Sequence, residues 1–401
     1  MSVRLTDAQR LDWLQLIRCD NVDPRTFRAL INKYGGAGAA LHALPDLIRQ
    51  AKGERAIRIF PRQEAEREME AAQKRRVAFG EADYPVALRA IDAAPPLLAV
   101  RGDLRALARP GVAIVGSRNA SAAGLAFADR LARGLGREGI SVVSGLARGI
   151  AAAAHRASLA TGTIAALAGG HARLYPPEHE ELAAAVCETG ALVSEMPLEW
   201  EPRGRDFPRR NRIVSGFSLA TVIVEAARRS GSLITARFAS EQGREVLAVP
   251  GSPLDPRAKG ANDLLREGAS LCTQVEDVMN AVAPMIAGGA PRDDLFGEEA
   301  PPRATDPLRD ESDIFGANPS PRTLADHEMD EESASPPVRM AVEGDRTEIV
   351  AALLGSSPVG VDELVRAAQL PAPDFHMALL ELEIAGRLER HGGNRVSLVA
   401  S

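Results

Sequence analysis

The sequence predicts an α/β protein with a doubly wound parallel sheet at its centre. Six apolar segments recur between residues 112 and 250, and helix-like stretches separate them. Near-continuous apolar strands are buried on both faces, and parallel strands need crossover helices between them. Turns that contain glycine and polar residues follow these segments. Ligands of such sheets bind beyond the carboxyl ends of the strands, so we expect a ligand site at that edge.

The composition is typical of a globular protein with two to three domains. The chain has 401 residues, of which 45% are hydrophobic and 25% are charged. Its three cysteines are far apart and form neither a disulfide framework nor a C-x-x-C metal pair. The first residues lack the apolar core of a signal peptide, and no apolar run is long enough to span a bilayer. We therefore expect a cytoplasmic protein.

The net charge of −6 is unevenly distributed along the chain. Residues 1–75 carry a net charge of +4 and residues 76–288 carry +2. Residues 289–340 carry −8 and residues 341–401 carry −4. The acidic balance therefore comes from the C-terminal part and does not exclude a polyanionic partner for the first two thirds.

Residues 1–75 are expected to form a small helical domain. Apolar residues recur at helical spacing after Asp7, a second helix begins at Pro24, and a third is interrupted at Pro45. Such a domain contacts either a nucleic-acid backbone or another protein, and the sequence leaves both open. A polar helix over residues 64–76 follows, and residues 97–102 are expected to form an edge strand.

Residues 76–288 are expected to form the central domain. Its six expected strands cover residues 112–115, 141–144, 163–168, 191–194, 221–226 and 246–250. The first strand ends at Gly116, and a helix-like stretch begins near Ser121. Strand, glycine turn and helix leave backbone N–H groups at a helix N-terminus, where an anion can bind. Ser117 and Arg118 lie in this turn, and the planar charge of the arginine suits phosphate.

The other turns at this edge supply further candidate binding residues. Their members are mostly basic or small, which suits an anion. The candidates are Arg148, Gly169, Gly170, Arg209, Arg210, Asn211, Arg212, Ser230, Gly231, Ser232, Lys259 and Asn262. Two alternatives stay open: the arginines of residues 209–212 pair with Glu195 or Glu225, and the serines of residues 230–232 only cap a helix.

Several classes of site are disfavoured. No G-x-G-x-x-G follows the first strand and no acid follows the second, which argues against a dinucleotide, and no P-loop motif occurs. His155, His171 and His179 match no metal-binding pattern, although Glu178 and Glu180 lie nearby. No nucleophile–base pair and no pair of catalytic carboxylates is recognisable. We expect no cofactor, no metal and no catalytic residue.

The C-terminal part divides into a linker and a last domain. Residues 289–340 are rich in Pro, Asp, Glu, Ser and Gly, which predicts a flexible acidic linker. Residues 341–401 predict three amphipathic helices and a hairpin that turns at Gly392-Gly393-Asn394, a winged-helix pattern. The third helix carries Glu381 and Glu383 but no basic residue, which argues against binding to duplex DNA and for contact with a protein.

Several motifs, in this order, resemble the bacterial DNA-processing protein DprA (Smf) family over roughly residues 77–275. They include VGSR, SGLARGI, ALAGG, SEMP, FPRRNRIVSG and KGAND. The resemblance implies an extended Rossmann domain, preceded by a helical domain similar to a sterile alpha motif (SAM) and followed by a winged-helix domain. It also implies a homodimer that binds single-stranded DNA and loads the recombinase RecA during natural transformation.

The resemblance assigns the same residues to DNA binding. Gly116, Ser117 and Arg118 would hold phosphate. Arg209, Arg210 and Arg212 would line the same basic pocket, together with Lys259 and Asn262. One departure is visible, because the family has an aspartate where this chain has Ala151; His155 fits the family pattern.

A second resemblance, of the same Rossmann type, is to nucleotide phosphoribohydrolases. Those enzymes carry a P-G-G-x-G-T-x-x-E signature, and the corresponding segments here supply no glutamate. A third possibility is a scaffold protein for which DNA contact is incidental.

Overall fold

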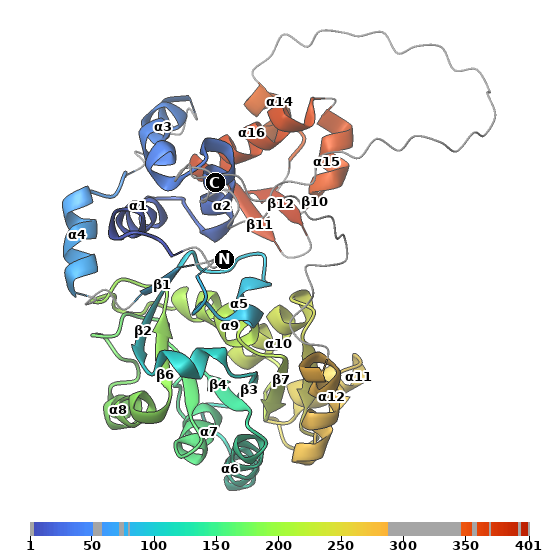
Figure 1. Ribbon diagram of the computed structural model, residues 1–401. Coiled ribbons are helices and arrows are strands. Elements are labelled where there is room, and N and C mark those ends of the chain that lie inside the picture. Colours follow the sequence, from blue (N-terminus) through green and yellow to red (C-terminus); the bar gives the residue numbers. More distant parts are fainter. Residues whose placement is uncertain are drawn as a thin grey trace, which may run out of the picture. The chain divides into compact units, whose positions relative to one another are not determined.

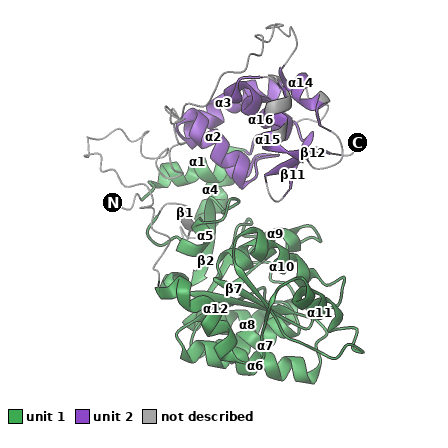
Figure 2. Cartoon of the chain, turned by 90° about the vertical axis from the view of Figure 1, so that its right-hand side faces the viewer, with its two compact units in different colours: residues 1–15, 61–304 green, residues 16–60, 305–401 purple. Residues whose placement is uncertain are grey.

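A computed structural model describes residues 4–50, 58–71, 76–78, 81–287, 346–354, 359–368, 370–391 and 394–399. The chain forms two compact units, residues 1–15 with 61–304 and residues 16–60 with 305–401 (Figure 2). The expected linker at residues 289–340 lies outside the described residues. None of the helices in the described ranges combines the length and apolar character needed to cross a bilayer.

The first unit is built around a nine-stranded sheet in the order β1-β2-β6-β5-β4-β3-β7-β8-β9 (Figure 1). The strands are β1 (Arg76–Ala78), β2 (Leu97–Gly102), β3 (Gly111–Gly116), β4 (Ser141–Ser144), β5 (Thr163–Ala166), β6 (Ala191–Ser194), β7 (Ala220–Val224), β8 (Glu245–Ala248) and β9 (Ser270–Leu271). All neighbours from β6 to β9 are parallel, which confirms the expected parallel sheet. The chain runs outward from β3 through β4, β5 and β6 and then returns to β7 on the other side of β3.

The expected edge strand at residues 97–102 is not at an edge. It is β2, which pairs antiparallel with β1 on one side and with β6 on the other. The prediction was wrong because β1 is only three residues long and gives no periodic signal. The first four residues of β2 are buried, as an inner strand requires.

Helices cover both faces of this sheet. They are α6 (Ala122–Arg137), α7 (Ile150–Ser158), α8 (Glu180–Thr189), α9 (Asp206–Gly216), α10 (Gly231–Glu241), α11 (Lys259–Arg266) and α12 (Val275–Ala287). The unit also contains most of α1 (Asp7–Ile17), together with α4 (Arg62–Ala71), α5 (Val86–Arg89) and short 3-10 turns at Leu104–Ala108 and Pro177–His179. The helix α6 packs on α7 and α12, whereas α9 packs on α10 (Figure 1).

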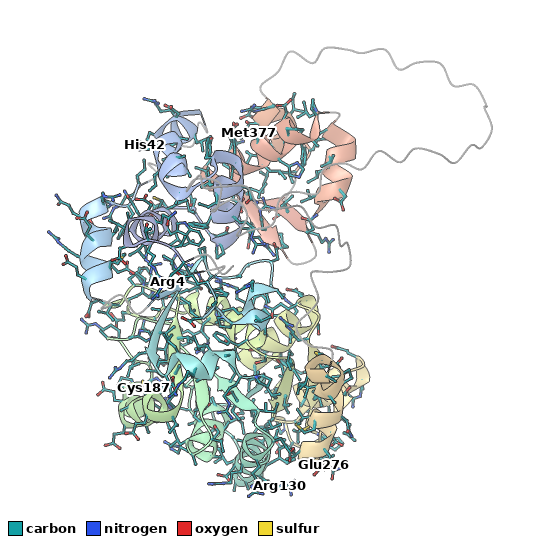
Figure 3. The ribbon with its side chains drawn as sticks, viewed as in Figure 1. Arg4, His42, Arg130, Cys187, Glu276 and Met377 are labelled. Atoms are coloured by element: carbon teal, nitrogen blue, oxygen red, sulfur yellow. The ribbon has the colours of Figure 1, made fainter. Side chains whose placement is uncertain are left out.

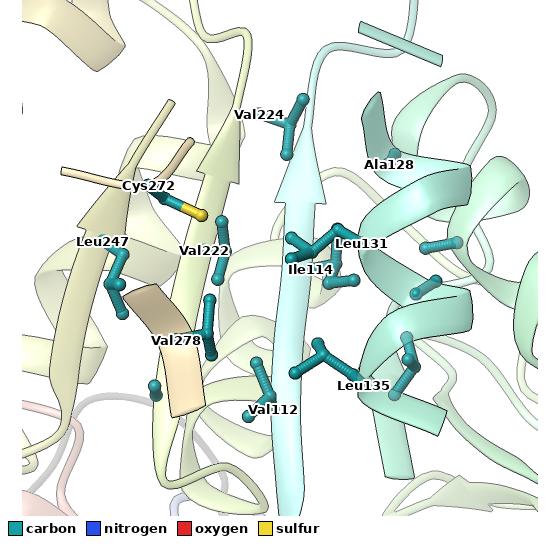
Figure 4. Packing of buried hydrophobic residues seen from close by; sticks show 14 of the residues in the cluster. Val112, Ile114, Ala128, Leu131, Leu135, Val222, Val224, Leu247, Cys272 and Val278 are labelled. Carbon is teal, nitrogen blue, oxygen red and sulfur yellow. The ribbon is translucent and has the colours of Figure 1, made fainter. Parts of the chain in front are cut away.

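The core of this unit lies between β3, β7 and the helices α6 and α12. Val112 and Ile114 alternate along β3, so both point to one face, where they meet Leu131 of α6 and Val278 of α12 (Figure 4). The intervening Ala113 is also buried, on the opposite face. Burial on both faces explains why these strands form unbroken apolar runs.

The second unit combines a segment from the N-terminal part of the chain with the C-terminal part. It contains α2 (Pro24–Tyr34), α3 (Ala37–Gln50), α14 (Arg346–Ala352), α15 (Val361–Ala368), α16 (Ala372–Ile384) and a sheet in the order β10-β12-β11, made of β10 (Val359–Gly360), β12 (Arg395–Leu398) and β11 (Leu388–His391). The hairpin β11–β12 was expected, but Gly392 and Gly393 lie outside the described residues. The helix α3 continues through Pro45, although the sequence predicted an interruption there. Proline removes one backbone donor, and burial of Ala40, Leu44 and Leu47 keeps the helix together.

The helix α16 packs on α2 and α3 as well as on its own domain. Every residue from Ala378 to Ile384 is buried, so the helix has no solvent face in this stretch. The Asn21 side chain donates to the Ile384 carbonyl oxygen at 2.6 Å. Lys33 Nζ lies 3.0 Å from Sδ of Met377, a residue of α16 that Figure 3 labels. The acidic third helix of the winged-helix pattern therefore contacts the chain's own N-terminal helices.

Replacement of Asn21 tests this contact. Asn21 has a left-handed backbone with φ of 60°. We expect Asn21→Ala to lower the free energy of opening of α16 by about 2 kcal/mol, because it removes a hydrogen bond and adds left-handed strain. Asn21→Gly loses only the hydrogen bond and is expected to cost about 1 kcal/mol. Amide hydrogen exchange of residues 372–384 measures both, and equal, negligible effects would contradict the contact.

Candidate functional site

A pocket of about 530 Å³ opens at the carboxyl ends of β3, β4 and β7. This is the point where the chain reverses its direction across the sheet, the usual ligand position in doubly wound folds. The lining includes Val115, Gly116, Ser117, Arg118, Asn119, Ser144, Gly145, Ala147, Ala151, Phe207, Pro208, Arg210, Asn211, Val214, Ala227, Arg229, Ser230, Gly231, Ser232, Ile234 and Thr235. Three of these are arginines and none is an acid.

Arg210 is the most deeply buried charge of the pocket. It is 7% exposed, and its Nη1 donates to the Gly145 and Ala166 carbonyl oxygens, each at 2.6 Å. Its Nε lies 3.2 Å from Asn211 Oδ1. Burial, together with the nearby charge of Arg118, lowers the pKa of Arg210 to about 10. No carboxylate in the described part of the chain pairs with it, so an anion in the pocket would relieve an uncompensated buried charge.

Two further arginines line the pocket, from the turns after β3 and β7. The Arg118 guanidinium lies 5.3 Å from the centre of the Phe207 ring. Arg229 comes from the turn between β7 and α10. Both side chains are exposed, and neither forms an ion pair with any residue that the structure describes. The two cations are thus available to an anionic ligand.

The N-terminus of α10 faces the same space. Ser230 precedes the helix, and its Oγ accepts the Ser232 backbone N–H at 3.3 Å. Gly231 and Ser232, in the first turn, line the pocket. The positive end of the helix dipole therefore adds to the three arginines.

The N-terminus of α6 is different, because the chain fills it with its own acid. Glu225 lies directly after β7 with φ of 52°, and its Oε2 accepts the Ser121 backbone N–H at 2.8 Å. Its Oε1 accepts the Ser121 hydroxyl, which in turn caps the Gly124 N–H at 3.0 Å. The sequence predicted that a ligand anion would bind at this helix N-terminus, but in the structure the Glu225 carboxylate lies there.

The four residues from Arg209 to Arg212 point in different directions, since successive side chains on a helix diverge by about 100°. Arg209 binds Glu195 Oε1 at 2.8 Å, and Arg212 binds Glu195 Oε2. Burial raises the pKa of Glu195, but the two arginines outweigh that effect, and the pKa is lowered overall. Only Arg210 and Asn211 of this group line the pocket. The alternative of pairing with Glu195 therefore applies to two of the three arginines.

The remaining predicted residues lie outside this lining. Arg148 is exposed, forms an ion pair with Glu178 and borders a small adjoining hollow. A Cβ on Gly170 would lie 2.0 Å from the Pro197 and Leu198 carbonyl oxygens, and Gly169 is packed in a similar way, so both serve close packing. Lys259 is exposed at the start of α11, and Asn262 exchanges two hydrogen bonds with the Gly251 backbone.

Sequence reasoning missed several lining residues, among them Asn119, Phe207 and Arg229. The signal for Arg229 was its position directly before the Ser-Gly-Ser turn that opens α10. Ala151, the position at which the resemblance led us to expect an aspartate, also lines the pocket and brings no charge to it. In the described ranges, no group of three or more His, Cys, Asp or Glu side chains is placed to hold a metal ion.

Two buried histidines support the turn after β4. His155 Nδ1 lies 2.8 Å from Thr163 Oγ1, whose hydroxyl donates to the Val142 carbonyl oxygen at 2.6 Å. The hydroxyl proton of Thr163 is therefore already used in this hydrogen bond. His155 must carry its proton on Nδ1 and donate it to Thr163, and its Nε2 accepts the Leu146 N–H at 3.3 Å. Burial, helped by the charges of Arg210 and His179, lowers the pKa of His155 to about 3.

Comparisons with known proteins point to one family. The family model described as DNA recombination-mediator protein A matches residues 75–283. The DprA-like N-terminal HHH domain matches residues 7–71, and the DprA winged helix domain matches residues 333–394. These matches agree with the expected helical and winged-helix domains.

The chain is also similar to individual members of this family. It is 36% identical over 320 residues to Protein Smf from Escherichia coli, covering 79% of this chain and 75% of that protein. It is 43% identical over 198 residues to DNA processing protein DprA from Bacillus subtilis, covering 49% and 67% of the two chains. The X-ray structure of DprA from Streptococcus pneumoniae has a TM-score of 0.56 and 31% identity, covering 69% of this chain and 98% of that one.

The low pKa of His155 predicts that stability falls in mild acid. The unfolded histidine takes up a proton near pH 6.5, whereas the folded one stays neutral down to about pH 3. Because only the unfolded state binds this proton between those values, the free energy of unfolding decreases by up to about 1.4 kcal/mol for each pH unit below 6.5.

Urea unfolding at pH 7, 6 and 5 measures this dependence. Both tryptophans, Trp13 and Trp200, report on the first unit. His155→Gln should flatten the dependence between pH 6.5 and 5, where carboxylates titrate little. The same slope in wild type and variant would contradict the assignment.

Proposed function

Because the chain belongs to the DNA-processing protein A (DprA, Smf) family, we propose that it binds single-stranded DNA in the pocket between β3 and β7. We further propose that it loads the recombinase RecA onto that strand during natural transformation. The observation that carries the proposal is a pocket with Arg118, Arg210 and Arg229 and no acid in its described lining. Such a site binds backbone phosphate independently of sequence.

The shape of the pocket favours a single strand over a duplex. The lining also includes the apolar side chains of Val115, Val214 and Ile234, and the Phe207 ring centre lies 5.3 Å from the Arg118 guanidinium. A duplex keeps its bases stacked inside and presents mainly phosphates, whereas a single strand can also place an unpaired base against an apolar or aromatic wall. The combination of cations and apolar surface therefore suits one or two nucleotides of an unpaired strand.

The partners of the proposed function are a second copy of the chain and RecA. The description of the matching family as a recombination mediator supports the role in recombination. The winged-helix domain is not proposed to bind the DNA, because residues 378–384 of its third helix are buried and the helix packs on α2 and α3.

The competing function is hydrolysis of the bond between base and ribose in a nucleotide. That chemistry needs an acid next to the ribose. In the described lining no aspartate or glutamate is present, and Glu225, beyond the end of β7, is bound to Ser121. We therefore propose a binding protein without catalytic activity at this site.

A salt titration of binding to a labelled single-stranded oligonucleotide tests the proposed site. Each phosphate neutralised contributes about 0.7 to the slope of log K against log salt for a single strand. We expect Arg118→Ala and Arg229→Ala each to weaken binding about equally for all sequences and to lower the slope by about one phosphate contact.

Arg105→Ala is the matched control. Arg105 is an exposed arginine paired with Asp103, and it does not line the pocket. Its slope should equal that of the wild type. A duplex of the same length should bind more weakly than the single strand. Unchanged affinity and slope in folded Arg118→Ala and Arg229→Ala variants would overturn the site assignment.

Incubation with nucleoside 5′-monophosphates separates binding from hydrolysis. We expect no free base by chromatography after prolonged incubation with the protein, because the described pocket offers no acid to activate water. Base release that disappears in a Glu225→Gln variant would instead establish the enzymatic function.

A further inference from the structure

Leu146 has a backbone conformation that a leucine seldom adopts. It is the second residue after β4, it is fully buried, and its φ of 55° lies in the left-handed region. A bulky residue keeps this conformation only when its surroundings hold it there, and such residues cluster at functional sites. Its neighbours Gly145 and Ala147 both line the pocket.

Two histidines hold the two polar groups of Leu146. His155 Nε2 accepts its N–H at 3.3 Å, and His179 Nδ1 lies 2.8 Å from its carbonyl oxygen. Since a carbonyl only accepts, His179 must donate from Nδ1. The histidines come from different elements, α7 and the turn before α8. The backbone of one strained residue is thus fixed from both sides.

We call Leu146, His155 and His179 the clasp. The clasp is connected to Arg210, the buried arginine of the pocket. The Gly145 carbonyl oxygen, directly before Leu146, accepts from Arg210 Nη1 at 2.6 Å. A Cβ on Gly145 would lie 2.6 Å from Arg210 Cζ, so the turn and the guanidinium are in close contact. A change in the Leu146 backbone would move this carbonyl and with it the direction in which Arg210 donates.

We propose that His155 and His179 are positioning residues, which hold Leu146 left-handed and thereby orient Gly145 and Arg210 toward the ligand. The role of the clasp in affinity rests on the proposed function, whereas its effect on the turn does not. Neither histidine lines the pocket, so both act through the backbone of residues 145–147. The experiments below distinguish this role from that of two core histidines without influence on the ligand.

The first comparison uses two replacements of His179 in the full chain. Asn places an amide donor where His179 has Nδ1–H, and Leu has a similar size without a donor. We expect His179→Leu to weaken binding of labelled oligothymidylate about tenfold, as the loss of one buried hydrogen bond implies. His179→Asn should stay within about threefold of the wild type. Equal losses in both variants would overturn the proposal.

The second comparison asks whether His179 acts through Arg210. In an Arg210→Lys background, the further effect of His179→Leu should shrink to about twofold or less, because the residue that it orients is already altered. In an Arg229→Lys background the loss should remain about tenfold, since Arg229 comes from the turn after β7 and no hydrogen bond joins it to the clasp in the described residues. Equal effects in the two backgrounds would show a general loss of structure and contradict the positioning role.

Amide hydrogen exchange tests the clasp without DNA. The Leu146 and Ala147 amides should exchange at least about tenfold faster in His179→Leu than in His179→Asn, while β4 and β5 stay protected. Unchanged exchange of this turn would refute the clasp even if DNA binds. Absence of DNA binding by the wild type would refute the proposed function, and the exchange result would still decide the clasp.

Discussion

The buried charge of Arg210 is the constraint on which the site depends. Arg210 is 7% exposed, and its Nη1 donates to two backbone carbonyl oxygens instead of a carboxylate. Carbonyls satisfy hydrogen bonds without neutralising charge. The charge of Arg210 therefore contributes a positive potential to the pocket. The charge of Arg212, by contrast, is balanced by its ion pair with Glu195. The strained turn after β4 and the two histidines behind it follow from the need to place one of those carbonyls.

The same sheet reversal explains why the cations gather at one place. Turns after β3 and β7 are neighbours only because the chain leaves β3 in one direction and later returns beside it. Arg118 and Arg229 are far apart in the sequence and meet across that reversal. Glu225 belongs to the same set of turns, but it is directed to the α6 terminus. The fold thus binds Glu225 to Ser121, and Glu225 is absent from the described lining that holds the three cations.

The sequence predicted the strands and the edge that carries the site, because buried strands and glycine turns are local patterns. It did not predict which arginine of residues 209–212 faces the pocket, since that depends on the rotation of α9 against the sheet. The sequence also could not predict that Glu225 binds at the α6 N-terminus, because Ser121 and Glu225 meet only in the folded chain. The continuity of α3 through Pro45 depends on burial, which is a tertiary property. A three-residue partner strand such as β1 carries too few residues for a pattern.

The joining of α2 and α3 with α16 has a consequence for synthesis of the chain. Lys33 and Met377, which touch across this contact, are 344 residues apart. At about 5–20 residues per second, the N-terminal helices wait on the order of 20 to 70 s before their partner helix emerges from the ribosome. During that time the surface that α16 will cover lacks its native partner, so the packing of these early helices is among the last to be completed. Chaperone demand should therefore concentrate on the beginning of the chain.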